Sequence, residues 1–167
     1  AIMRNWIFSF IAFIILILTS CSSTKIISDD RQYYVEAMGV GNDGTYVIKV
    51  TDFFRTVDEE VYLDGLKKDA VHCVIYNGIP AGNGSMRQPA LMTGDTRLEG
   101  CEQLLNDFFQ QKQYHLFVNA IVNSSKTISK IKGSKNYKVS VIMSVAKDDL
   151  RQYLIDKNII KPLNYIF

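Results

Sequence analysis

The sequence lacks the residue spacings on which common metal and nucleotide sites depend. It has only two histidines and three cysteines in 167 residues, and their spacing matches no compact zinc pattern. It also has no Gly-Lys-Ser/Thr, which a phosphate-binding P-loop requires, so Gly82-Asn83-Gly84 predicts a turn rather than a phosphate site. We therefore expect no metal, no cofactor and no enzymatic activity.

The sequence also lacks an apolar run long enough to cross a membrane comfortably. The run from Trp6 to Leu18 is about a dozen residues long, whereas a spanning helix needs roughly 20. Arg4 precedes this run and small residues follow it, in the order of a secretory signal. We predict a cleaved signal peptide over residues 1–20, and an uncleaved anchor helix is the alternative.

The residues at the predicted cleavage site, Leu18-Thr19-Ser20-Cys21, resemble a bacterial lipobox. The resemblance implies that Cys21 is diacylated through its sulfur, palmitate being a suitable label, and that the chain is cut before it. Two or more acyl chains hold a protein stably on a membrane. We expect residues 21–32 to form a polar tether. Because no aspartate follows Cys21, we expect an outer-membrane lipoprotein that faces the periplasm.

Residues 33–167 form one predicted domain of globular composition. The whole chain is 47% hydrophobic and 22% charged, which is close to the globular average. A chain of this size can bury a self-supporting core. The formal net charge is only +2, so it indicates no particular partner, and we expect no nucleic-acid binding.

Hydrophobic periodicity predicts an α+β domain with the element order ββααββα. T-x-x-E capping boxes at Thr56–Glu59 and Thr96–Glu99 each predict the start of a helix. We expect a mostly antiparallel sheet with helices packed on one face. The predicted elements are two strands around the turn 41–44, a helix ending near 77–78, a helix from 96 onward, a strand over 114–122, a lysine-rich connection or hairpin over 123–136, a strand over 137–145 and a helix over 147–157.

The polar residues of the first predicted helix have simple structural interpretations. Acidic residues near a helix start complement its dipole, so we predict a solvated acidic face. His72 and Cys73 are adjacent and face different sides of a helix, which predicts an exposed histidine and a buried cysteine rather than a catalytic pair. The acidic residues concerned are Asp58, Glu59, Glu60, Asp64 and Asp69.

Two alternatives stay open for Cys73 and Cys101. An exported protein reaches a compartment that permits disulfides, and acylation of Cys21 leaves these two cysteines as the pair. Each cysteine also lies on an apolar helical stripe, where it can serve as a small buried side chain. The sequence therefore predicts either a bridge or two buried thiols.

The lysines between Asp107 and Asp148 form a basic segment, because no acidic residue lies in that interval. Such a segment can dock on an anionic surface or an acidic envelope protein. It can equally protect the edge of a sheet from aggregation. The predicted docking patch consists of Lys126, Lys130, Lys132, Lys135 and Lys138.

Four segments carry a resemblance to Bacteroidota-type envelope lipoproteins. They are GVGNDGTYVIKV, KKDAVHCVIYNGIP, QPAL and YKVSVIMSVAKDDLRQYLIDKNIIKPL. The strand-then-helix ending is also distantly similar to small α+β periplasmic domains of flagellar-assembly and curli-associated lipoproteins. These resemblances imply a non-enzymatic scaffold or accessory role in envelope assembly. The alternative is a small-ligand-binding module with the loop 79–95 as a lid, which requires an apolar pocket under that loop.

Overall fold

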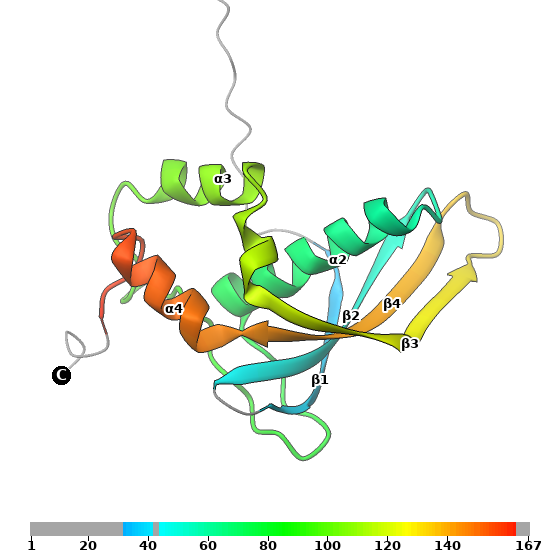
Figure 1. Ribbon diagram of the computed structural model, residues 1–167, viewed down its shortest axis with the longest axis horizontal. Helices are drawn as coiled ribbons and strands as arrows, with labels where there is room; N and C mark the ends of the chain where they lie inside the picture. The colour runs from blue at the N-terminus through cyan, green and yellow to red at the C-terminus, as the bar shows by residue number, and fades with distance from the viewer. Residues whose placement is uncertain (1–31, 42–43, 163–167) are drawn as a thin grey trace, which may run out of the picture.

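The computed structural model of the protein describes residues 32–41 and 44–162. Its strands form one antiparallel sheet in the order β1-β2-β4-β3, so β1 and β3 are its edges (Figure 1). The central pair β2 and β4 runs without a register shift. The strands are β1 (Tyr34–Val40), β2 (Thr45–Phe54), β3 (Val118–Lys130) and β4 (Tyr137–Ala146).

The α-helices lie on one side of this sheet (Figure 1). They are α2 (Glu59–His72), which continues as the π-helix η1 (Cys73–Asn77), α3 (Glu102–Gln110), which precedes the 3-10 helix η2 (Gln113–Phe117), and α4 (Lys147–Asp156). This arrangement confirms the predicted α+β class, and the element order ββααββα agrees with it in outline.

The core lies between the sheet and α2. Ile48 and Val50 of β2, Val141 of β4 and Leu66 of α2 are completely buried in one cluster. Full burial of a side chain of this size contributes about 1.5–3 kcal/mol, so this layer is the main source of stability.

No described helix covers the opposite face of the sheet (Figure 1). Tyr34 and Phe53 form an edge-to-face pair on this open face, with ring centroids 6.1 Å apart, and are 63% and 39% exposed. The hydroxyls of Thr51 and Ser140 lie beside them, buried and hydrogen-bonded at 2.8 Å. The open face therefore combines exposed aromatic rings with two hydroxyl groups that are already hydrogen-bonded to each other.

The first capping box lies just ahead of its helix. Asp58 is the N-cap of α2, and its carboxylate accepts a hydrogen bond from the Glu60 N–H at 3.0 Å. The Thr56 hydroxyl accepts from the Asp58 N–H at 3.1 Å and so forms the turn before the helix. The predicted helix is therefore confirmed, but it begins a few residues later than the capping box indicates.

The helix start predicted from the second capping box is wrong. α3 begins at Glu102, and the Thr96 hydroxyl donates to the Leu91 carbonyl at 3.1 Å within a turn. The backbone here pairs with the end of the chain instead, since the Leu98 N–H donates to the Ile159 carbonyl at 3.0 Å. This pairing with a distant segment prevents an earlier helix start.

The segment before β4 also differs from the prediction. Residues 113–117 form η2 rather than a strand, and β3 continues to Lys130 through the polar segment predicted as a connection or hairpin. A register shift follows Val122, where the Ser125 hydroxyl accepts from the Ile142 N–H at 2.8 Å in place of a strand carbonyl. An edge strand with little buried surface lacks the apolar alternation that reveals strands in a sequence.

Candidate functional site

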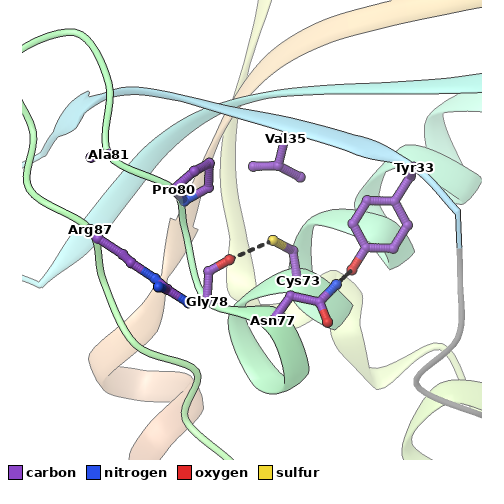
Figure 2. A pocket seen from close by; sticks show the side chains of 8 residues that line it. All are labelled: Tyr33, Val35, Cys73, Asn77, Gly78, Pro80, Ala81 and Arg87. Atoms are coloured by element: carbon purple, nitrogen blue, oxygen red, sulfur yellow. Dashed lines mark hydrogen bonds between the residues drawn. The ribbon is translucent and has the colours of Figure 1, made fainter.

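A pocket of about 420 Å³ lies at the C-terminal end of α2 (Figure 2). This volume falls within the usual range of small-ligand sites, roughly 300–1,000 Å³. Three parts of the chain enclose it: the start of β1, the π-helix η1 and the loop that follows η1. We call it the Arg87 pocket, and its lining residues are Tyr33, Val35, Cys73, Asn77, Gly78, Pro80, Ala81 and Arg87.

The π-helical turn η1 shapes one side of the pocket. The Gly78 N–H donates to the Cys73 carbonyl at 2.8 Å, which closes the wider turn. The Val74 carbonyl accepts from the Leu91 N–H at 3.0 Å, so the end of the helix is joined to the returning loop. Gly78 has φ 72° and ψ 178°, a conformation that is essentially confined to glycine. π-Turns are rare and frequently occur at functional sites.

His72 is completely buried beside the pocket, which corrects the prediction of an exposed histidine. Its Nδ1 lies 2.8 Å from the Tyr33 hydroxyl, and this hydroxyl also accepts from the Asn77 side-chain amide at 3.0 Å (Figure 2). The His72 ring packs on Tyr76 with centroids 4.5 Å apart. Tyr33 thus fixes the start of the domain to the end of α2. The histidine ring contacts Tyr33, Tyr76 and Phe109, and two of these come from distant segments.

Cys73 and Cys101 are both buried and free, so the structure contains two buried thiols and not the disulfide. The Cys73 thiol donates to the Gly78 carbonyl at 3.0 Å (Figure 2). Burial raises the pKa of Cys73 to about 12; a hydrogen bond with Tyr33 opposes the rise and the charge of Asp69 adds to it. Because only the thiolate is nucleophilic, this thiol is inert at neutral pH.

The loop after η1 is held against the domain at several points. Ile79 and Gln88 exchange two backbone hydrogen bonds of 2.9 Å, and the Tyr46 hydroxyl donates to the Gln88 side chain at 2.8 Å. The Asn83 amide donates to the Ala37 carbonyl of edge strand β1. The loop therefore forms one wall of the Arg87 pocket and covers part of the β1 edge.

Arg87 extends from this loop toward Gly78 (Figure 2). Its side chain is exposed and forms no ion pair with a described carboxylate, whereas Arg97 pairs with Glu102 at 2.6 Å. An unpaired guanidinium beside a largely apolar lining offers a fork of N–H donors to an anionic group.

A second polar cluster is centred on Asp64 and joins α2 to η2. His115 Nε2 lies 2.6 Å from Asp64 Oδ1, the Tyr114 hydroxyl donates to the same oxygen at 2.8 Å, and Lys112 Nζ lies 3.0 Å from Oδ2. Partial burial by itself raises the pKa of Asp64, but hydrogen bonds from these three side chains outweigh it and lower the pKa to about 2. This cluster is far along α2 from His72, so the two histidines do not share a site.

The acidic residues of α2 do not form one solvated face. Asp58, Glu59 and Glu60 are exposed at the start of the helix, as predicted. Asp69 is completely buried, which contradicts the prediction. It lies three residues after the buried Leu66, and residues at that spacing share one helix face.

The predicted docking patch is not a single free surface. Lys126 forms an ion pair with Glu59, so the basic segment and the acidic helix start, separate in sequence, meet in space. Lys130 Nζ lies 5.9 Å from the centroid of the Tyr137 ring. The exposed remainder is Lys132 and Lys135 in the turn after β3, and Lys138 on the open face. Two of the five lysines lie on edge strand β3, as edge protection predicts.

Two further findings concern the part of the chain that the structure describes. No group of three or more His, Cys, Asp or Glu side chains there is arranged to hold a metal ion. No helix there has both the length and the apolar character of a membrane span. The predicted signal peptide, Cys21 and nearly all of the tether lie outside the described residues.

The sequence predicted the loop of the Arg87 pocket but not that Tyr33 and Arg87 line the pocket, nor that His72 is buried beside it. An arginine between turn formers and a proline was the available signal for Arg87, whereas no local pattern pairs Tyr33 with His72. No family model matches the chain, and neither the curated proteins nor the solved structures gave a match. The resemblance to Bacteroidota-type envelope lipoproteins therefore stays a prediction.

Proposed function

We propose that the protein is a lipid-anchored outer-membrane protein that faces the periplasm and acts as a non-enzymatic scaffold or accessory subunit. The order of charge, apolar run and Cys21 in the sequence supports the anchor. In the structure, the bond from Tyr33 to His72 gives the chain a fixed point of entry into the domain. A tether of about a dozen residues limits how far the domain can lie from its anchor.

The open face of the sheet is the observation that carries the scaffold role. The exposed rings of Tyr34 and Phe53 lie beside Lys138 and Glu36, around a shallow hollow on that face. Aromatic side chains are enriched at protein interfaces, with charged groups at the rim. The partner is therefore an envelope protein that buries these two rings.

Metabolic labelling with palmitate tests the anchor. The wild-type chain takes up label and Cys21→Ser takes up none. Label retained by the serine variant contradicts the lipid anchor, whatever the result for the scaffold role.

Crosslinking in the protein's own envelope, followed by affinity purification, tests the scaffold role. The variant Tyr34→Ser/Phe53→Ser removes both rings from the open face, and Val61→Ser/Leu116→Ser is the matched control at exposed apolar positions outside the sheet. We expect one crosslinked partner with the wild type and the control, and its loss with the ring variant. Identical crosslinks in all three chains contradict an interface on the open face.

Small-ligand binding is a second candidate function, and the Arg87 pocket favours it. The position of the pocket between the domain and the loop over 79–95 supports this alternative. Its lining is apolar with a few polar groups, as is usual for ligand sites. The loop is hydrogen-bonded at its base, so it serves as a preformed wall.

A further inference from the structure

The Arg87 pocket combines apolar walls with one charged group. Val35, Pro80 and Ala81 provide aliphatic surface from β1 and from the loop. Among the described residues that line the pocket, Arg87 alone carries a charge, because the lining includes no carboxylate and no lysine. The one charge that the described lining presents to a ligand is therefore positive.

The neutral polar groups of the pocket are largely engaged with one another. The Tyr33 hydroxyl is bonded to His72 and to Asn77, and the Cys73 thiol donates to the Gly78 carbonyl. Since burial keeps the pKa of Cys73 at about 12, the thiol adds no charge. Arg87 is thus the group whose donors remain for a ligand.

We propose that the Arg87 pocket binds a small monocarboxylate with an apolar body. Its carboxylate pairs with Arg87, and its body packs on Val35, Pro80 and Ala81. A planar guanidinium matches a carboxylate through two parallel hydrogen bonds. An inorganic anion could use Arg87 but would leave the aliphatic walls uncovered. This inference rests on the ligand-binding function proposed above and adds the class of ligand.

Matched probes test the carboxylate on the purified full chain. The probes are N-acetyl-leucine and its neutral amide, N-acetyl-leucinamide, and binding is followed by calorimetry. Loss of a charge-assisted hydrogen-bonded pair weakens binding by about 10-fold to 100-fold. We expect Arg87→Gln to weaken binding of the acid by that factor and to leave the amide unchanged. Arg55→Gln removes an exposed arginine outside the pocket and is the control that should change neither.

A second variant separates the carboxylate from the pocket itself. Ala81→Phe places a ring in the pocket without changing its charge, so both probes should bind at least 10-fold more weakly. Hexanoate in place of N-acetyl-leucine distinguishes a fatty acid from an amino-acid or peptide terminus, and Arg87-dependent binding of either supports the proposal. If acid and amide bind equally and Arg87→Gln changes the affinity of neither, the proposed pairing of a carboxylate with Arg87 is contradicted, whereas ligand binding by the pocket is supported. If neither probe binds the wild type, both proposals fail.

Discussion

The two ends of α2 carry polar side chains in opposite settings. At the N-terminal end, Glu59 stays exposed and pairs with Lys126 across the surface. At the C-terminal end, Asp69 and His72 are completely buried, and Tyr33 reaches His72 from the segment before β1. Surface ion pairs contribute about 0–1 kcal/mol, whereas a buried polar group left without its partner costs about 1–3 kcal/mol.

The difference arises from what covers each end of the helix. The N-terminal end adjoins the hairpin of β3 and β4, whose turn is exposed. The C-terminal end is enclosed by β1 and by the loop over 79–95, which together form the Arg87 pocket. The C-terminal end of α2, beside the pocket, should therefore be sensitive to substitution, and the surface around its N-terminal end, beside the hairpin, should be tolerant. Four sets of variants test this contrast, in order of decreasing effect on stability.

Gly78→Ala should have the largest effect. An added Cβ would lie 2.3 Å from the Gln88 carbonyl oxygen and 2.7 Å from the Ala90 nitrogen, and both are backbone atoms of the loop. Because the loop must move and φ is +72°, we expect a loss of about 3 kcal/mol or more in the free energy of unfolding. Urea denaturation measures it.

Gly133 is the matched control at the hairpin end. Its φ is +78°, but an added Cβ meets nothing within 4 Å. Gly133→Ala should therefore cost only the conformational strain, about 1–2 kcal/mol. Equal losses for the two alanine variants would show that crowding by the loop adds nothing at Gly78.

His72→Ala should have the next largest effect. It removes a buried ring and the partner of the Tyr33 hydroxyl. We expect a loss of about 3 kcal/mol, from the cavity and the broken hydrogen bond together. His115→Ala at the partly exposed Asp64 cluster should cost about 1 kcal/mol. Thermal unfolding of both variants measures the contrast, and similar losses would contradict the distinction between a buried and a surface histidine.

The sheet could be predicted from the sequence because its central strands are covered on one face. Val139, Val141 and Met143 recur at every second position of β4 and are completely buried, and three residues of the opposite face, Lys138, Ser140 and Ser144, are polar. Antiparallel strands with one covered face show this alternation. The helix α4 was predicted for the same reason, since Leu150 and Leu154 share its inner face and are buried.

The pocket end could not be predicted, because it depends on contacts between distant segments. Asp69 was grouped with the acidic residues near the helix start and so assigned to solvent, although its spacing from Leu66 puts it on the buried face. His72 was also assigned to solvent, but the rings of Tyr33 and Phe109, from distant segments, contact it in the interior. Thr96 fits the pattern of a helix cap. Because the backbone around it pairs with the segment around Ile159, Thr96 lies in a turn instead. Such contacts between distant segments have no local signature in one sequence.

Asp64→Asn should have a smaller effect on the free energy of unfolding, and this effect should depend on pH. Its pKa falls from the ordinary 3.8 to about 2 in the folded protein, so its contribution is present above about pH 4 and is lost as the pH falls through about 2. Because the cluster is partly exposed, we expect Asp64→Asn to cost about 1 kcal/mol at pH 7. Urea unfolding between pH 7 and 2.5 should show the gap to wild type narrowing. Asp95→Asn, at an exposed carboxyl outside the cluster, should show no such gap.

The hairpin lysines should have the smallest effect on stability. Lys130, Lys132 and Lys135 are exposed and form no ion pair with a described carboxylate. Their joint replacement by glutamine should shift the free energy of unfolding by less than about 0.5 kcal/mol, since solvated surface substitutions rarely do more. Lys126 stays in this variant, so the ion pair with Glu59 is kept.

The same triple variant tests whether the hairpin docks on an anionic surface. Each lysine near an anionic membrane contributes about 1 kcal/mol, so three replacements should weaken vesicle binding by a factor on the order of a hundred. Co-sedimentation of residues 21–167 carrying Cys21→Ser, which lack both the acyl chains and the apolar run over 6–18, with anionic vesicles and with cell-wall sacculi across a salt series, measures this. Binding should weaken with salt, because exposed charges are screened over about 8 Å at physiological ionic strength. If both chains sediment alike at every salt concentration, the lysines protect the β3 edge and do not dock.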